Sequence, residues 1–262
     1  MSQSFELNYD TNNEMPAKLA LRVSAPEIDG AFPLSPVQAG MLFHSLYAPE
    51  AGLYLEQIVL NIDGELDVQL FECAWQRVVD HHAILRTSFH WEGLDHPLQR
   101  VHSKARLPFS YHDWRELASA EQESRFGSFV RADRKAGFDF AAPPLMRLAL
   151  VRFAADSHRL IWTNHHALLD GWSQSLVLKQ VFSIYRALVA GEEAALEPSP
   201  SFRNYIDWLE TQDSGEAEQF WKQTLKDFTA PTALAIDKCA AGSRKEVVTH
   251  DQQELRFSVE AT

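Results

Sequence analysis

The chain has 262 residues, 45% of them hydrophobic, and carries 24 Lys and Arg against 36 Asp and Glu, for a net charge of −12. This length and composition allow one sizeable core or two small ones. The negative charge argues against a nucleic-acid partner or an anionic membrane surface, because phosphate binding needs the opposite sign.

The cysteines and the hydrophobic runs exclude further classes. The two cysteines, Cys73 and Cys239, have no second Cys or His near them at metal-ligand spacing, which disfavours a disulfide scaffold and a zinc ribbon. The segment Met1–Asn13 is polar and acidic, and no apolar run reaches the length of a membrane span. We therefore expect no signal peptide, no membrane span and a cytoplasmic protein.

Residues 1–30 are polar without a sustained period, which predicts a linker or tail, or alternatively a docking segment for an upstream protein. A helix is expected from Pro36, because Ser35 is a good N-cap and proline suits the first helical turn. Leu55 to Ile62 alternates as a strand does, and Asp63 with Gly64 supplies turn chemistry after it.

The middle of the chain continues to alternate helices with strands. The spacing of apolar residues from Val68 to His82 predicts an amphipathic helix, and Leu98 to His102 reads as a short strand. Ser119 with Gln122 three residues later predicts a capping box at a further helix start.

A predicted hairpin leads to the most informative stretch. Leu145–Phe153 and Arg159–Asn164 read as its two strands, and Leu176–Leu188 reads as the helix that follows and ends at Gly191. The end of a strand is a place where side chains project from a rigid support.

Two histidines, His165 and His166, stand at this strand end, followed by Asp170 and Gly171. Histidine exchanges a proton readily near neutral pH, since its reference pKa is about 6.5. Neighbouring side chains of a strand point to opposite faces. We therefore expect His166 to face a cleft and His165 to face the supporting structure.

The pattern His-His-x-x-x-Asp-Gly resembles the active-site signature of the condensation domains of non-ribosomal peptide synthetases, and the resemblance covers about Phe32 to Phe228. Further stretches that resemble motifs of this family, in the same order, are Leu34–His44, His81–Phe89, Phe138–Arg147, Ser201–Leu209 and Phe220–Leu225.

The resemblance implies an α/β fold like a subdomain of chloramphenicol acetyltransferase, with a mixed β-sheet and packed helices. Family members are expected to have two such subdomains that face each other across the active site. No counterpart of the later motifs is found, so residues 31–262 are interpreted as the N-terminal subdomain, with the second subdomain absent.

The implied activity is the formation of an amide bond between a donor acyl thioester and an acceptor amine. Both substrates would be carried on peptidyl carrier proteins, whose phosphopantetheine arms belong to those partners, so no cofactor of its own is implied. Adjacent synthetase domains are the other expected partners. His166 would act as general base, orient the amine or stabilise the tetrahedral intermediate.

The resemblance also assigns roles to other residues. The stretch His81–Phe89 departs from the family motif, with His81 in place of an arginine and Ala83 in place of a glutamate. A buried carboxylate needs a cation or donor, so we expect Arg86 to pair with Asp170 and brace the site. Gly171 would give the turn its conformational freedom.

Three alternatives stay open. His166 and Asp170, four residues apart, would share one helix face and hold a metal ion, although further ligands are missing nearby. A related acyltransferase that uses coenzyme A carries the shorter His-x-x-x-Asp pattern. A non-catalytic half-domain would bind only a carrier protein or a neighbouring domain.

Overall fold

The structure is a computed structural model that describes residues 28–194 and 196–230. Its main sheet has four strands in the order β2-β7-β6-β5. The strands are β2 (Leu55–Asp63), β5 (Phe109–Asp113), β6 (Met146–Ala154) and β7 (Ser157–His165). Strand β5 runs parallel to β6, while β7 is antiparallel to both of its neighbours. The expected α/β class with a mixed sheet is confirmed.

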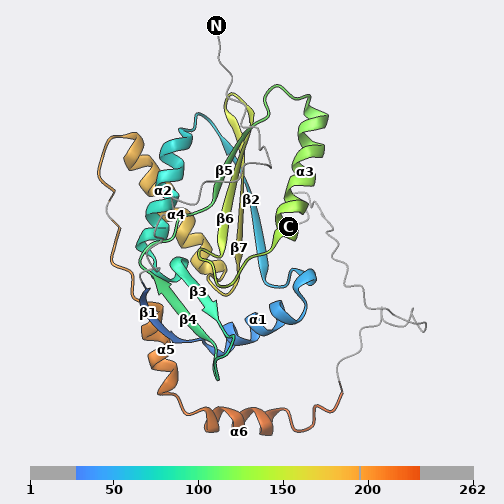
Figure 1. Cartoon of the computed structure of the whole chain (residues 1–262), viewed down its shortest axis with the longest axis vertical. Coiled ribbons are helices and arrows are strands. Elements are labelled where there is room, and N and C mark those ends of the chain that lie inside the picture. Colours follow the sequence, from blue (N-terminus) through green and yellow to red (C-terminus); the bar gives the residue numbers. More distant parts are fainter. Residues whose placement is uncertain (1–27, 195, 231–262) are drawn as a thin grey trace, which may run out of the picture.

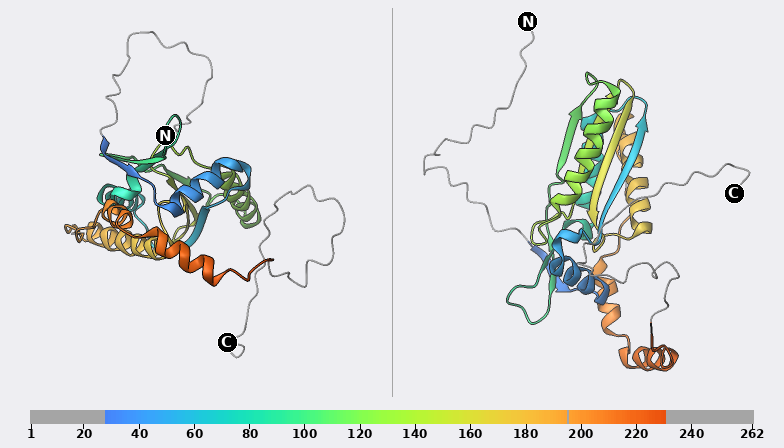
Figure 2. Two further views of the ribbon diagram at one scale, coloured as in Figure 1. Left: turned by 90° about the horizontal axis from the view of Figure 1, so that it is seen from below. Right: turned by 90° about the vertical axis from the view of Figure 1, so that its right-hand side faces the viewer.

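Helices cover both faces of this sheet (Figures 1 and 2). Helices α2 (Val68–His81) and α4 (Gly171–Val189) pack together on one face, and α3 (Ser119–Ala136) lies on the other. The alternation of β6 explains this arrangement. Leu148 and Leu150 belong to the core under α2 and α4, whereas Ala149 and Val151 belong to the core under α3.

Two tryptophans join the sheet to α2 in the centre of the larger core. Trp75 of α2 and Trp162 of β7 are fully buried, and their rings meet edge to face with centroids 5.0 Å apart. Such aromatic pairs contribute about 0.5–1.5 kcal/mol beyond the burial of their area. This contact fixes the strand that ends at His165.

A second, smaller sheet has the order β1-β4-β3. It contains β1 (Ile28–Pro33), β3 (Thr87–His90) and β4 (Leu98–His102). The predicted boundary at residue 30 therefore falls inside β1, and residues 1–27 lie outside the described part. Helix α1 (Pro36–Tyr47) follows β1 with the expected N-cap at Ser35, which forms a capping box with Gln38.

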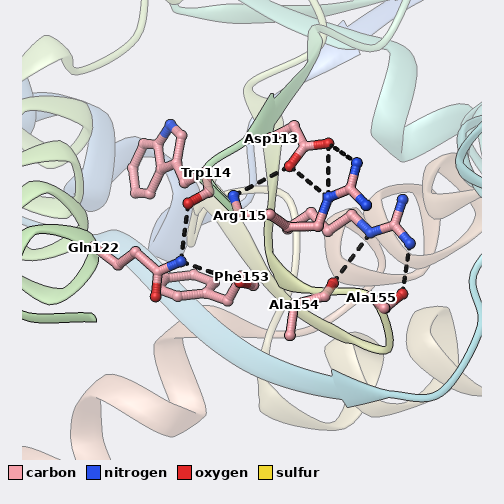
Figure 3. A network of polar contacts seen from close by, with 8 residues as sticks. Asp113, Trp114, Arg115, Gln122, Phe153, Ala154 and Ala155 are labelled. Atoms are coloured by element: carbon pink, nitrogen blue, oxygen red, sulfur yellow. Dashed lines mark hydrogen bonds and ion pairs between the residues drawn. The ribbon is translucent and has the colours of Figure 1, made fainter. Parts of the chain in front are cut away.

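The capping box predicted at Ser119 and Gln122 is wrong. Ser119 is already the first residue of α3, and the side chain of Gln122 donates instead to the carbonyls of Trp114, at 2.9 Å, and Phe153, at 3.1 Å (Figure 3). These carbonyls occupy a corner at the end of the sheet away from His165, and a buried amide satisfies both.

The remaining elements are the short helices η1 (Pro49–Ala51) and η2 (Ala83–Arg86) and the helices α5 (Phe202–Glu210) and α6 (Ser214–Thr224). None of the described helices combines the length and the apolar character needed to cross a membrane. Cys239 lies outside the described residues.

Candidate active site

The two histidines lie where β7 ends and a turn begins. The backbone N–H of His165 donates to the carbonyl of Leu145 at 3.0 Å, and that of His166 donates to the carbonyl of Tyr54 at 2.8 Å. Residues 166–168 form a turn, and α4 starts at Gly171. The predicted strand, turn and helix are confirmed, and both histidines have backbones anchored by the neighbouring chain segments.

The side chain of His165 is buried and faces α1. Its Nδ1 accepts from the N–H of Ala167 at 3.2 Å, so the ring proton lies on Nε2, which donates to Oγ of Ser45 at 3.1 Å. Burial lowers the pKa of His165 to about 4, and the neighbouring His166 contributes to this shift. His165 is therefore a neutral supporting group, as strand alternation predicts.

His166 is half-buried, with 30% of its side chain exposed. Its Nδ1 is shielded from solvent and lies 2.9 Å from Oε1 of Glu56, within ion-pair distance, at an angle outside that of a hydrogen bond. Nε2 has no hydrogen-bond partner among the described residues. This nitrogen is the one available to a substrate.

Glu56 is a site residue that the sequence analysis missed. It lies on β2 directly opposite Asn164 of β7, and its Oε2 accepts from Nε2 of Gln174 on α4. The same Gln174 nitrogen lies 3.4 Å from Oδ1 of Asn164. The available signal was an acidic side chain within the predicted strand Leu55–Ile62, but only the pairing of β2 with β7 places it beside His166.

Asp170 does not pair with Arg86, which corrects the prediction. Asp170 is exposed and caps α4, where its carboxylate accepts from the N–H of Ser173 at 2.8 Å. Hydrogen bonding to Ser173 lowers the pKa of the Asp170 carboxyl. Because the carboxylate is solvated and bonded to the helix N-terminus, it needs no cation in this structure.

Arg86 has its partners in the smaller sheet. Its side chain is 10% exposed and lies 3.2 Å from Oδ2 of Asp29, and it also donates to the carbonyl of His102. The turn η2 directs Arg86 toward β1 and β4 and away from α4. Arg86 therefore joins η2 to this sheet. Among the described contacts, none connects Arg86 with His165 or His166.

Gly171 does not need the conformational freedom that was expected of it. It is the first residue of α4, its φ is not in the left-handed region, and a Cβ added there would meet nothing within 4 Å.

The premise of the metal alternative also fails. Residues 166–170 form turns and an irregular segment, so His166 and Asp170 do not share a helix face. Among the described residues, no group of three or more His, Cys, Asp or Glu side chains is arranged to hold a metal ion.

A pocket of about 490 Å³ is lined by His165 and not by His166, so the expectation that His166 faces the cleft is not borne out for this pocket. Ser45 and Phe140 line it together with three cations at the end of α3. The cations are Arg131, Arg134 and Lys135. They give one wall of the pocket a positive charge in an otherwise acidic chain.

Comparison with known proteins decides the family. The protein-family model described as Condensation domain matches residues 28–262 of this chain. The chain belongs to the condensation-domain family. This match confirms the resemblance to condensation domains of non-ribosomal peptide synthetases that the signature around His166 indicated.

Related sequences are parts of large synthetases. The condensation domain is 43% identical over 235 residues to one of the proteins that make up the linear gramicidin synthase of Brevibacillus parabrevis, covering 90% of this chain and 3% of that protein. It is 34% identical over 242 residues to bacitracin synthase 3 of Bacillus licheniformis, covering 91% of this chain and 4% of that protein.

Solved condensation domains share the fold. The starter condensation domain of the rhizomide synthetase RzmA matches with a TM-score of 0.67 at 22% identity, over 77% of this chain and 49% of that one. The first condensation domain of the calcium-dependent antibiotic synthetase matches with a TM-score of 0.68 at 19% identity, over 78% and 50%. The chain thus spans about half the length of these structures. The predicted chloramphenicol acetyltransferase-like fold is confirmed.

Proposed function

We propose that this condensation domain forms an amide bond between a donor acyl thioester and an acceptor amine, with His166 acting on the amine. The supporting observation is the orientation of His166. Its Nδ1 is shielded against Glu56, and its Nε2 is left without a partner among the described residues. A ring held in this way presents one nitrogen to a substrate.

The reaction needs a group that handles a proton. An α-amine with a reference pKa of about 7.7–8.0 is largely protonated at neutral pH and cannot attack a carbonyl until it loses a proton. In the proposed step the amine nitrogen attacks the thioester carbon, the C–N bond forms and the C–S bond breaks. The ammonium form first releases one proton to solvent. The proton that the attacking nitrogen then loses is taken up at Nε2 of His166 and passes to the departing thiolate.

The partners in this proposal are donor and acceptor peptidyl carrier proteins and adjacent synthetase domains. The phosphopantetheine arms are covalent parts of the carrier proteins, so the domain needs no cofactor of its own. We place the reaction in the cytoplasm, where thiols such as the released one are kept reduced.

We also propose that residues 31–262 form the N-terminal subdomain of a two-part condensation domain. A match that covers 51% of the length of a solved starter condensation domain supports this assignment. In that arrangement a second subdomain would form a cleft over His166, and Asp170 with Gly171 would shape the turn at its edge.

The experiment is intact-mass analysis of the acceptor carrier protein after mixing loaded donor and acceptor carriers with the domain. A mass gain equal to the donor acyl group, lost in His166→Ala, supports the proposal. A gain that persists undiminished in His166→Ala contradicts the role of His166. Carrier binding without any gain favours the non-catalytic reading.

A second arm offers the donor as a coenzyme A thioester. This arm is informative because a mutant of the starter condensation domain of the rhizomide synthetase has been solved in complex with C8-CoA. Transfer from coenzyme A with no transfer from a loaded carrier favours the acyltransferase alternative.

A further inference from the structure

We propose that Glu56 is a positioning residue that fixes the tautomer of His166, with the proton on Nδ1 and the lone pair on Nε2. This inference rests on the proposed role of His166, because the lone pair on Nε2 is what the reaction uses. It adds to the signature a residue about a hundred positions upstream.

Glu56 lies against the shielded nitrogen of the His166 ring. Nδ1 of His166 is shielded from solvent and lies 2.9 Å from Oε1 of Glu56. A neutral imidazole carries its proton on one nitrogen and a lone pair on the other. The carboxylate oxygen attracts an N–H on Nδ1 and repels a lone pair there, although the contact is not aligned as a hydrogen bond.

A contact from α4 holds the carboxylate of Glu56 in place. Its Oε2 accepts from Nε2 of Gln174, a buried residue of α4. The same nitrogen lies 3.4 Å from Oδ1 of Asn164 on β7. Gln174 therefore presents its NH₂ group to two acceptors, which fixes the direction of its amide. Residues from β2, β7 and α4 converge, so the carboxylate has little freedom to turn away.

The substitution Glu56→Gln should invert the tautomer of His166. Glu56→Gln keeps the shape of the side chain but makes one of its two ends a donor. Because the NH₂ of Gln174 faces one end, the oxygen of the introduced amide faces Gln174 and its NH₂ faces His166. Nδ1 must then accept, and the proton moves to Nε2. The substitution removes the lone pair from the substrate side without removing any atom of His166.

A precedent gives the scale of the effect. In the serine-protease triad, replacing the aspartate behind the histidine by asparagine lowers kcat by about 10⁴ through the wrong tautomer. His166 is 30% exposed, so water offers it other partners. We therefore expect Glu56→Gln to lower kcat by about 10²-fold with KM little changed, and Glu56→Asp to retain more activity.

The deciding experiment does not need activity. The full chain is labelled with ¹⁵N at its 11 histidines, and two-bond ¹H–¹⁵N spectra are recorded at a pH where the imidazoles are neutral. The His166 signals are assigned by their loss in His166→Ala. The expected result is a protonated Nδ1 in the wild-type protein and in Glu65→Gln, an exposed control without a described contact to His166. In Glu56→Gln, the proton is expected on Nε2.

Two results would overturn the inference. One is a wild-type protein with the His166 proton on Nε2, a result that stands even if Glu56→Gln does not fold. The other is a folded Glu56→Gln protein with the wild-type tautomer. The proposed function fails in a different way, through full condensation activity of His166→Ala, and that result leaves the spectra unchanged.

Discussion

Nε2 of His165 donates to Oγ of Ser45 on α1 at 3.1 Å, while Oγ of Ser45 donates to the carbonyl of Met41 at 2.8 Å. This relay connects the signature turn to the first helix, which is 120 residues away in sequence. Every proton in it has an acceptor only while the His165 ring is neutral, since a second ring proton on Nδ1 would meet the N–H of Ala167. His165 therefore supports the fold in its uncharged form.

The first prediction follows from this neutrality. Burial lowers the pKa of His165 from its ordinary value to about 4, so the unfolded chain binds a proton at a higher pH than the folded one does. The free energy of unfolding should then fall as the pH drops from about 6.5 to about 4, by about 3 kcal/mol in total from this group. Above this range the group contributes no pH dependence.

Urea unfolding of the wild-type protein and of His165→Gln, measured over this pH range, tests the prediction. Other buried histidines, including His102 and His158, also have pKa values lowered by desolvation, so both proteins lose stability in acid. As the pH falls, the free energy of unfolding should decrease more steeply for the wild-type protein than for His165→Gln, and the difference is the contribution of His165. Parallel curves would contradict the assignment.

Asp170→Ala should lower the free energy of unfolding by about 1 kcal/mol, because α4 loses its N-cap hydrogen bond to Ser173. Asparagine caps helices about as well as aspartate, so Asp170→Asn is the matched control and should lose little. Chemical denaturation compares the two variants. Equal losses would show that the charge of Asp170, and not its capping bond, stabilises the turn.

Arg86→Met should cost about 2 kcal/mol or more, since the buried carbonyl of His102 loses its donor. Asp29 is half exposed, so Asp29→Asn should cost much less. A double-mutant cycle between Arg86 and Asp170 should be additive within about 0.5 kcal/mol, because the two residues share no described partner. A larger coupling energy would show that Arg86 and Asp170 interact, contrary to the structure.

His166→Ala should lower the rate of amide formation by about 10²–10⁴, while the free energy of unfolding changes by less than about 1 kcal/mol. The side chain is partly exposed and its ring nitrogens make few contacts, so its loss removes little packing. Single-turnover mass spectrometry gives the rate, and thermal unfolding gives the stability. A variant that fails to fold would assign His166 a structural role instead.

The sequence predicts the parts of the site that depend on local signals. The hairpin of β6 and β7, the helix α4 and the burial of His165 follow from strand alternation and helical spacing. Strands β1, β3 and β5 have only four to six residues and were not predicted, although β4, of similar length, was.

The contacts of His166 and Arg86 with residues from distant segments could not be predicted from the sequence. Glu56 meets His166 only through the register of β2 on β7, and Arg86 turns toward Asp29 because η2 and β1 are brought together by the smaller sheet. The proposed pairing of Arg86 with Asp170 assumed a buried carboxylate. Asp170 is instead exposed and caps α4, so its carboxylate does not need a cation.

The central position of β7 in the sheet determines how the site is lost when the protein unfolds. This strand pairs with β2 through all nine of its residues and with β6 along most of its length. Its amide hydrogens should therefore exchange with deuterium only when the whole sheet opens, and the N–H of His165 should be among the slowest. Local fraying would not separate His165 and His166 from the core, so active and folded molecules should disappear together as denaturant rises.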